Sequence, residues 1–302
     1  MVRQVHRTRQ SVCLTTLIAC GVLLAGCDGQ TGEGPGDSGP SPTATRDPRP
    51  LKPEGLIGNW TLADVDEPGA GTVLRLAPQE LDVVGSRCGT LGGAWRADPD
   101  GLFLASIHSA FTYAVEGIPG CARASQDTPD WLRRVTAYRF DDGGRPVLLD
   151  DLAQPVARLI PGATPTAGPD MLDSALAPPV VTDEARRDLA ATPALPATLT
   201  PVDPHRLARH WVPVSGHRAA YVKFTAGGGW HGSDGCNDSR GRWLTAPGGA
   251  LLATVGAVTL VGCESVPVDH WLSTARRAGF DGADLVLLDV RGRETGRLRA
   301  TG

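Results

Sequence analysis

The pattern of apolar and polar positions changes several times along the chain. One mainly apolar run near the start is followed by a stretch rich in Gly, Pro, Ser and Thr. Two later regions carry short apolar runs bounded by Gly, Pro and Asp, and a Pro-, Ala- and Thr-rich stretch lies between them. Stretches without large apolar residues cannot bury a core and stay flexible. We predict five parts: a leader (1–27), a tether (28–54), a first domain (55–160), a linker (161–204) and a second domain (205–302).

Short β-rich runs predict that both domains are mainly β. In the second domain these runs are AYVKF (220–224), GRWLT (241–245) and ADLVLLDV (283–290), and each is bounded by turn-forming residues. The chain has 38 glycines and 25 prolines, a high content that suits many β-turns and linkers. The expected fold class is therefore mainly β with a small helical part.

Apolar residues at helical spacing predict one helix in each domain. In the second domain Ser265 and Pro267 mark its start, since a capping residue and a proline in the first turn are typical of helix N-termini. Thr128 and Pro129 do the same in the first domain, and a further short helix is expected within 182–190. The residues expected on the inward helix faces are Trp131, Val135 and Tyr138 in the first domain and Trp271, Leu272, Ala275 and Ala278 in the second.

The two domains repeat each other in the order of their rare residues. An L-x-x-x-W segment, a cysteine with a tryptophan seven residues later, a second cysteine, a Trp-Leu pair and a Leu-Leu-Asp segment follow one another in both. We interpret this as a duplication of one domain. The matched positions are Leu56 and Leu207, Trp60 and Trp211, Cys88 and Cys236, Trp95 and Trp243, Cys121 and Cys263, and Trp131 and Trp271.

The leader has the features of a bacterial lipoprotein signal. Three arginines and no acid precede an apolar run of 13 residues, which is shorter than the roughly 20 that a helix needs to span a bilayer. The run ends in Leu24-Ala25-Gly26-Cys27, which resembles a lipobox, so we expect a diacylglyceryl group on Cys27. The alternatives are a weaker match ending at Cys20, a cleaved signal with an incidental cysteine, and an uncleaved anchor.

Charge limits the partners of the mature chain. With the arginines of the leader removed, the net charge falls from −4 to about −7. A negative chain does not bind nucleic acid or anionic lipid by bulk electrostatics. We therefore expect the lipid to hold the protein at the extracytoplasmic face of the cell membrane. The expected partners are an unknown envelope protein or a small ligand, and no nucleic acid.

The four cysteines of the domains favour disulfide bridges over a catalytic or zinc-binding role. In an oxidising compartment, paired cysteines of small domains tend to be bridged. Bridges Cys88–Cys121 and Cys236–Cys263 would each close a loop of about 30 residues and stabilise the fold by about 3 to 4 kcal/mol. A catalytic thiol needs a histidine, which is missing near Cys88, and a zinc site needs further Cys or His ligands.

A polar cluster surrounds Cys236 and is the main candidate for a site. His231, Asp234, Asn237 and Asp238 could be metal ligands or acid–base groups, but the matching segment of the first domain has no His, Asp or Asn. Side chains of Asp and Asn in turns commonly bind nearby backbone. We interpret the cluster as such a turn, and we expect no catalytic residue, no metal and no cofactor.

A family pattern runs through the second domain at spaced positions. Its residues are Leu207 and Trp211, Gly235-Cys236-Asn237, Gly241 and Trp243, and Thr259 with Cys263. With them the domain resembles the META domain, the module of the HslJ heat-shock lipoproteins. The resemblance covers about 95 residues, and the first domain fits it less well because Cys88 is followed by glycine and the later threonine is missing. It implies a small, barrel-like antiparallel β domain with one helix and no established enzyme activity.

These observations predict a membrane-anchored lipoprotein with two META-like domains and a non-catalytic binding or envelope-stress role. The first alternative is a carrier that holds a small hydrophobic ligand inside a barrel-like domain. The third and last hypothesis is an envelope enzyme, because neither domain offers a credible set of catalytic residues.

Overall fold

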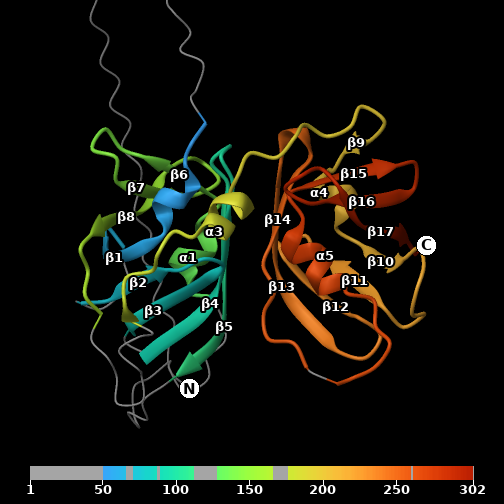
Figure 1. The fold of residues 1–302 in the computed structure, drawn as a ribbon, viewed down its shortest axis with the longest axis horizontal. Helices are drawn as coiled ribbons and strands as arrows, with labels where there is room; N and C mark the ends of the chain where they lie inside the picture. The colour runs from blue at the N-terminus through green and yellow to red at the C-terminus, as the bar shows by residue number, and fades with distance from the viewer. Residues whose placement is uncertain are drawn as a thin grey trace, which may run out of the picture. The chain divides into compact units, whose positions relative to one another are not determined.

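A computed structural model of the chain describes residues 50–65, 71–86, 89–111, 128–165, 176–259 and 261–301 (Figure 1). All of them belong to one compact unit, Pro48–Gly302. Their strands form two antiparallel sheets, which confirms the predicted mainly β class. No helix among these residues is long and apolar enough to cross a membrane.

The first sheet has eight strands in the order β5-β4-β3-β2-β1-β8-β7-β6, drawn in blue to green in Figure 1. A short 3-10 turn, η1 (Pro53–Leu56), precedes it, and helix α1 (Asp130–Arg134) lies between β5 and β6 in the chain. Its strands are β1 (Gly58–Ala63), β2 (Val73–Leu76), β3 (Glu80–Ser86), β4 (Gly89–Ala97), β5 (Phe103–Phe111), β6 (Ala137–Phe140), β7 (Pro146–Leu149) and β8 (Pro155–Pro161).

The second sheet has nine strands in the order β14-β13-β12-β11-β10-β17-β16-β15-β9. Helix α4 (Pro204–Leu207) precedes β10, turn η2 (Pro247–Gly249) precedes β14, and α5 (Val268–Thr274) precedes β15. The strands are β9 (Thr200–Pro201), β10 (His210–Pro213), β11 (Tyr221–Phe224), β12 (Gly229–Ser233), β13 (Asp238–Ala246), β14 (Ala250–Ala253), β15 (Arg277–Asp281), β16 (Asp284–Leu288) and β17 (Glu294–Ala300).

The two sheets share one strand order. When β9 is left out, each strand of the second sheet corresponds to the strand of the first sheet whose number is lower by nine, so that β10 corresponds to β1 and β17 to β8. The pairing also matches, because Trp60 on β1 lies opposite Pro161 on β8 and Trp211 on β10 lies opposite Ala300 on β17. Both indoles donate a hydrogen bond to the carbonyl four residues earlier, at 2.8 Å in the first domain and 2.9 Å in the second. The L-x-x-x-W repeat therefore marks the same local structure twice.

Two glycines show the same correspondence at close backbone contacts. Gly93 on β4 and Gly241 on β13 lie so near the carbonyl oxygens of Ser106 and Thr254 that a Cβ at either position would overlap that oxygen. Only glycine allows such an approach between backbones. Both glycines lie two residues before a matched tryptophan, so the backbone contact recurs at the same place in each sheet.

Tryptophan and large aliphatic side chains fill the cores. Six of the seven tryptophans are buried, and only Trp271 is partly exposed. Trp95 stacks on Phe103 in the first core with ring centroids 5.9 Å apart, and Trp211 stacks on Phe280 in the second at 6.0 Å. Offset aromatic pairs of this kind add to the stabilisation from burial alone.

The helices are shorter than the sequence pattern predicted. α1 ends at Arg134 and α5 at Thr274, so Tyr138 and Ala278 lie in strands β6 and β15 and not on helix faces. Directly after each helix the chain pairs with a strand of the sheet. In the first domain the amide of Thr136 donates a hydrogen bond to the carbonyl of Leu149 at 2.9 Å, and the equivalent hydrogen bond of the second domain measures 2.8 Å. Sheet pairing therefore overrides the helical period there.

The segment between the domains is more ordered than a plain linker. It contains α3 (Asp183–Asp188), a helix expected from the sequence, whose amide at Ala185 donates to the Thr182 hydroxyl at 3.0 Å. Ala185 is buried in the core of the first domain. Further along, Phe280 of β15 pairs with Thr200 of β9. The described part of this segment thus packs against both domains.

Candidate functional site

A disulfide at the β12–β13 turn confirms the predicted bridge of the second domain. Cys236 is bonded to Cys263, with their Cα atoms 6.6 Å apart. The bridge ties this turn to the segment that leads into α5. Cys27, Cys88 and Cys121 lie outside the described residues, so the lipidation of Cys27 and the bridge Cys88–Cys121 stay predictions.

Asp234 organises the turn around the disulfide. Its Oδ1 accepts hydrogen bonds from the amides of Cys236 at 2.7 Å and Asn237 at 2.6 Å, which confirms the predicted side-chain-to-backbone turn. Burial alone would raise the pKa of Asp234, but the hydrogen bonds from Asn237, Cys236 and Ser265 outweigh it and hold the pKa below the ordinary value. The carboxylate is thus committed to the fold and is poorly suited to act as a general base.

Asn237 joins this turn to the segment before Cys263. Its side chain is 7% exposed, donates to the carbonyl of Val261 at 3.0 Å and accepts from the amide of Val261 at 2.6 Å. The Thr259 hydroxyl donates to the same amide oxygen at 3.2 Å. Asn237 and Thr259 are two of the residues on which the META resemblance rests, and both have structural roles here.

The four candidate residues around Cys236 do not form one site. His231 is exposed on β12 and its ring lies edge-on to Tyr221, while Asp238 is exposed at the start of β13. In the part of the chain that the structure describes, no group of three or more His, Cys, Asp or Glu side chains could hold a metal ion. The geometry gives structural roles to Asp234 and Asn237.

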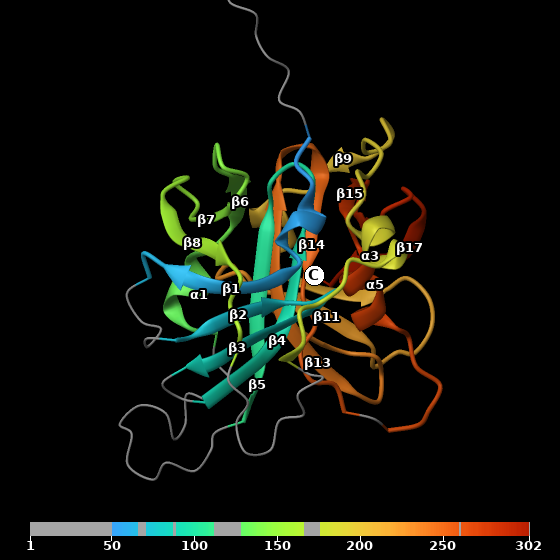
Figure 2. The same cartoon turned by 60° about the vertical axis from the view of Figure 1, so that its left-hand side comes forward.

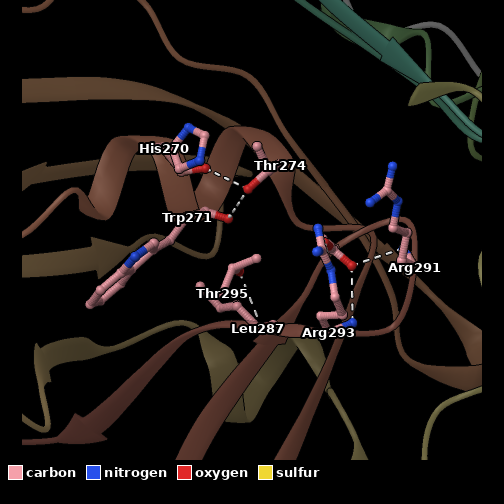
Figure 3. A network of polar contacts seen from close by, with 8 residues as sticks. His270, Trp271, Thr274, Leu287, Arg291, Arg293 and Thr295 are labelled. Carbon is pink, nitrogen blue, oxygen red and sulfur yellow. Dashed lines mark hydrogen bonds and ion pairs between the residues drawn. The ribbon is translucent and has the colours of Figure 1, made fainter. Parts of the chain in front are cut away.

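A first cavity lies beside α5, and it is lined by charges of both signs. It has a volume of about 780 Å³, and its described lining residues include four arginines and three carboxylates. The carboxylate of Asp289 accepts hydrogen bonds from Nε and Nη2 of Arg293 at 2.9 and 2.7 Å. It also accepts one from the backbone amide of Arg291 at 2.8 Å. Figure 3 shows these arginines together with Thr274, whose hydroxyl donates to the carbonyl of His270 at 2.7 Å. This cavity is polar but close to neutral.

A second cavity of about 470 Å³ lies where β5 meets β13, and we call it the β5–β13 cavity. Figure 2 shows β4 and β5 beside β13 and β14. Residues of β5, α1, β12 and β13 line it, and none of the described lining residues is an aspartate or glutamate. Its basic lining residues are His108, Arg133, His231, Arg240 and Arg242.

Two arginines link the domains in a reciprocal way. Arg242 on β13 donates to the carbonyls of Ala105 at 2.7 Å and Arg133 at 2.8 Å in the first domain. Arg96 on β4 donates to the carbonyl of Ser273 at 3.2 Å in the second. Arg133 and Ser273 occupy equivalent places, two residues after the matched tryptophans of α1 and α5. Each domain therefore binds the helix end of the other.

Sequence reasoning missed both arginines, although a signal was available. Arg96 directly follows Trp95, and Arg242 directly precedes Trp243. Successive residues of a strand point to opposite faces, so a neighbour of a core tryptophan faces outward. An arginine there could have been predicted on the outer face, but not its partner, which belongs to the other domain.

Comparisons of the chain with protein-family models, with characterised proteins and with solved structures find no match.

Proposed function

We propose that the chain is an exported, lipid-anchored protein that displays two META-like domains at the extracytoplasmic face of the membrane and binds a partner or ligand without catalysis. The observation that carries the proposal is the leader, in which a basic start and a 13-residue apolar run end at Leu24-Ala25-Gly26-Cys27. The roles of Asp234 and Asn237 in the fold support a non-catalytic function, since the best candidate for chemistry is occupied with hydrogen bonds.

A barrel-like form of each domain belongs to this proposal. Its support is the contact between the first and last strands of each repeated order, through Leu102 and Ala137 in the first domain and Ala250 and Arg277 in the second. A sheet whose edge strands meet leaves fewer backbone groups unpaired. The META resemblance rests on the residues of the second domain.

The alternative of a hydrophobic-ligand carrier has less support. Large side chains occupy the inside of each sheet, where Trp95 stacks on Phe103 and Trp211 on Phe280. The two cavities described above are lined by charged and polar residues together with smaller apolar parts, such as Ile107 and Trp230 in the β5–β13 cavity. A polar ligand or a protein partner suits these surfaces better than an apolar one.

The anchor is tested by replacing its cysteine. Cys27→Ala should move the protein from the membrane fraction to the soluble extracytoplasmic fraction, because the lipid and not the charge holds it to the bilayer. The matched control is Cys20→Ala, which should leave the protein in the membrane fraction. Fractionation with a metabolic lipid label measures both variants. Continued lipid labelling of Cys27→Ala, or release by Cys20→Ala, would show that the anchor has been assigned to the wrong residue.

A further inference from the structure

We propose that the β5–β13 cavity binds the oxyanion, a phosphate or carboxylate group, of a small molecule, and that Arg242 is its principal cation. The proposal rests on the binding function proposed above and names the class of ligand. Three features of the cavity support this binding: the charge of Arg242 has no described carboxylate beside it, two polar atoms of the wall lack described partners, and β5 is bulged at His108.

Arg242 differs from two other buried arginines, Arg276 and Arg96, in having no described carboxylate that raises its pKa. Burial lowers the pKa of Arg276, at 8% exposed, but the charges of Asp188, Asp98 and Asp289 partly offset it. Burial and next the charge of Arg276 lower the pKa of Arg96, at 7% exposed, to about 10, and the charge of Asp188 partly offsets them. For Arg242, burial and next the charge of Arg133 lower the pKa to about 10, and no described carboxylate raises it. Partly buried charges are normally compensated. A bound anion would supply that compensation.

The guanidinium of Arg242 keeps donors for a ligand. Its hydrogen bonds from Nη1 to the carbonyl of Ala105 and from Nη2 to the carbonyl of Arg133 use two of the five N–H groups of an arginine. These bonds also fix the position of the side chain, so little freedom is lost on binding. A planar guanidinium held in this way suits the paired oxygens of a carboxylate or phosphate. Arg133 itself forms an ion pair with Asp130, so Arg242 carries the uncompensated charge.

Two polar atoms in the wall lack hydrogen-bond partners. Ser106 is 4% exposed and its Oγ is unpartnered, and so is Nδ1 of His108, among the residues that the structure describes. Buried polar atoms without partners are uncommon in native proteins. Both residues line the cavity, and rotation of the Ser106 hydroxyl about χ1 would turn a donor toward an anion beside Arg242.

A bulge in β5 sets the position of His108. On β4, Gly93 pairs with Ile107 and Gly92 with Ser109, so His108 is the extra residue of the bulged strand. Bulges commonly redirect a side chain near a binding site. His108 also packs against Gly256 of the second domain, where a Cβ would lie 3.2 Å from the histidine Cβ. Both domains therefore shape this wall.

The test is calorimetric titration of the detergent-purified mature protein with inorganic phosphate, glycerol 3-phosphate and succinate. At least one of the three should bind, and Arg242→Met should weaken its binding by about tenfold or more, because the variant loses hydrogen bonds to a charged group, which are stronger than neutral ones. The matched control is Arg96→Met, which removes the reciprocal arginine but does not touch this cavity. Its affinity should stay within about twofold of the unmutated protein.

A second variant covers the case in which Arg242→Met does not fold. Ser106→Ala removes a hydroxyl that has no described partner, so it should keep the thermal stability and still weaken binding severalfold. Absence of binding of all three probes to the unmutated protein would overturn the proposal. So would equal weakening by Arg96→Met, or unchanged affinity of both Ser106→Ala and a folded Arg242→Met. None of these results would bear on the lipid anchor at Cys27, which is tested by fractionation.

Discussion

Replacing Cys236 with alanine should lower the free energy of unfolding of the protein by roughly 2 to 5 kcal/mol, the usual cost of losing a native disulfide from a small secreted domain. The bridge to Cys263 closes 27 residues of chain, and Asp234 and Asn237 are held at the same corner, so its loss also loosens their hydrogen bonds. Denaturant unfolding of the variant and the unmutated protein, both oxidised, measures the difference.

The double variant Cys236→Ala/Cys263→Ala is the control for this effect. If the two cysteines act only through their bond, the double variant should be about as stable as either single one, because the energies of residues in contact are not additive. A loss twice as large, or an unchanged stability of Cys236→Ala, would contradict the structural role of the bridge.

Gly241→Ala should cost about 3 kcal/mol, at the upper end for overpacking, because the new Cβ would overlap the carbonyl oxygen of Thr254 and the strands must separate. Gly93→Ala should have an effect of similar size, since a Cβ there would overlap the oxygen of Ser106. Chemical denaturation followed by tryptophan fluorescence measures both losses.

The control for the two glycine variants is Gly227→Ala. A Cβ at Gly227 would meet no atom within 4 Å, and its φ is not positive, so stability should change by less than about 1 kcal/mol. If Gly241→Ala or Gly93→Ala were as mild as this control, the close backbone contact that recurs in the two domains would not be a constraint of the fold.

The sequence predicted the repeated features well because each depends on local pattern or on rare residues. Trp131 and Leu272, predicted on inward helix faces, are buried, and paired cysteines predicted the bridge that is described, Cys236–Cys263. The β-rich runs predicted β11, β13 and β16 to within two residues at their C-termini, whereas β13 begins at Asp238, three residues before the predicted run. These features need only short-range information, because the residues within a strand and the turn-forming residues beside it are both visible in the local sequence.

Features that depend on contacts between distant segments could not be predicted. The β5–β13 cavity needs Ser106 and Arg242 to meet across more than a hundred residues. The segment around Ala185 is ordered because Ala185 is buried in a core whose other residues come from distant parts of the chain. The helices end early because of pairing partners such as Leu149, which no helical period reveals. Tertiary contacts decide each of these cases.

The turn around Asp234 combines contacts that the local sequence predicts with contacts that it does not. The sequence predicted a turn whose side chains bind nearby backbone, and the two amide bonds of Asp234 confirm it. It gave no indication that Asn237 would reach across to Val261, because that contact spans 24 residues. The hydrogen bonds that complete the corner are therefore a property of the folded domain.

Non-reducing peptide mapping by mass spectrometry of the mature protein, extracted from membranes, tests the central claim most directly. That claim is an exported, lipid-anchored chain made of two copies of one domain. The account predicts a diacylglyceryl group on an N-terminal Cys27 and two bridges, Cys236–Cys263 and Cys88–Cys121. An unmodified Cys27, or a bridge such as Cys88–Cys236 that joins the two domains, would contradict it.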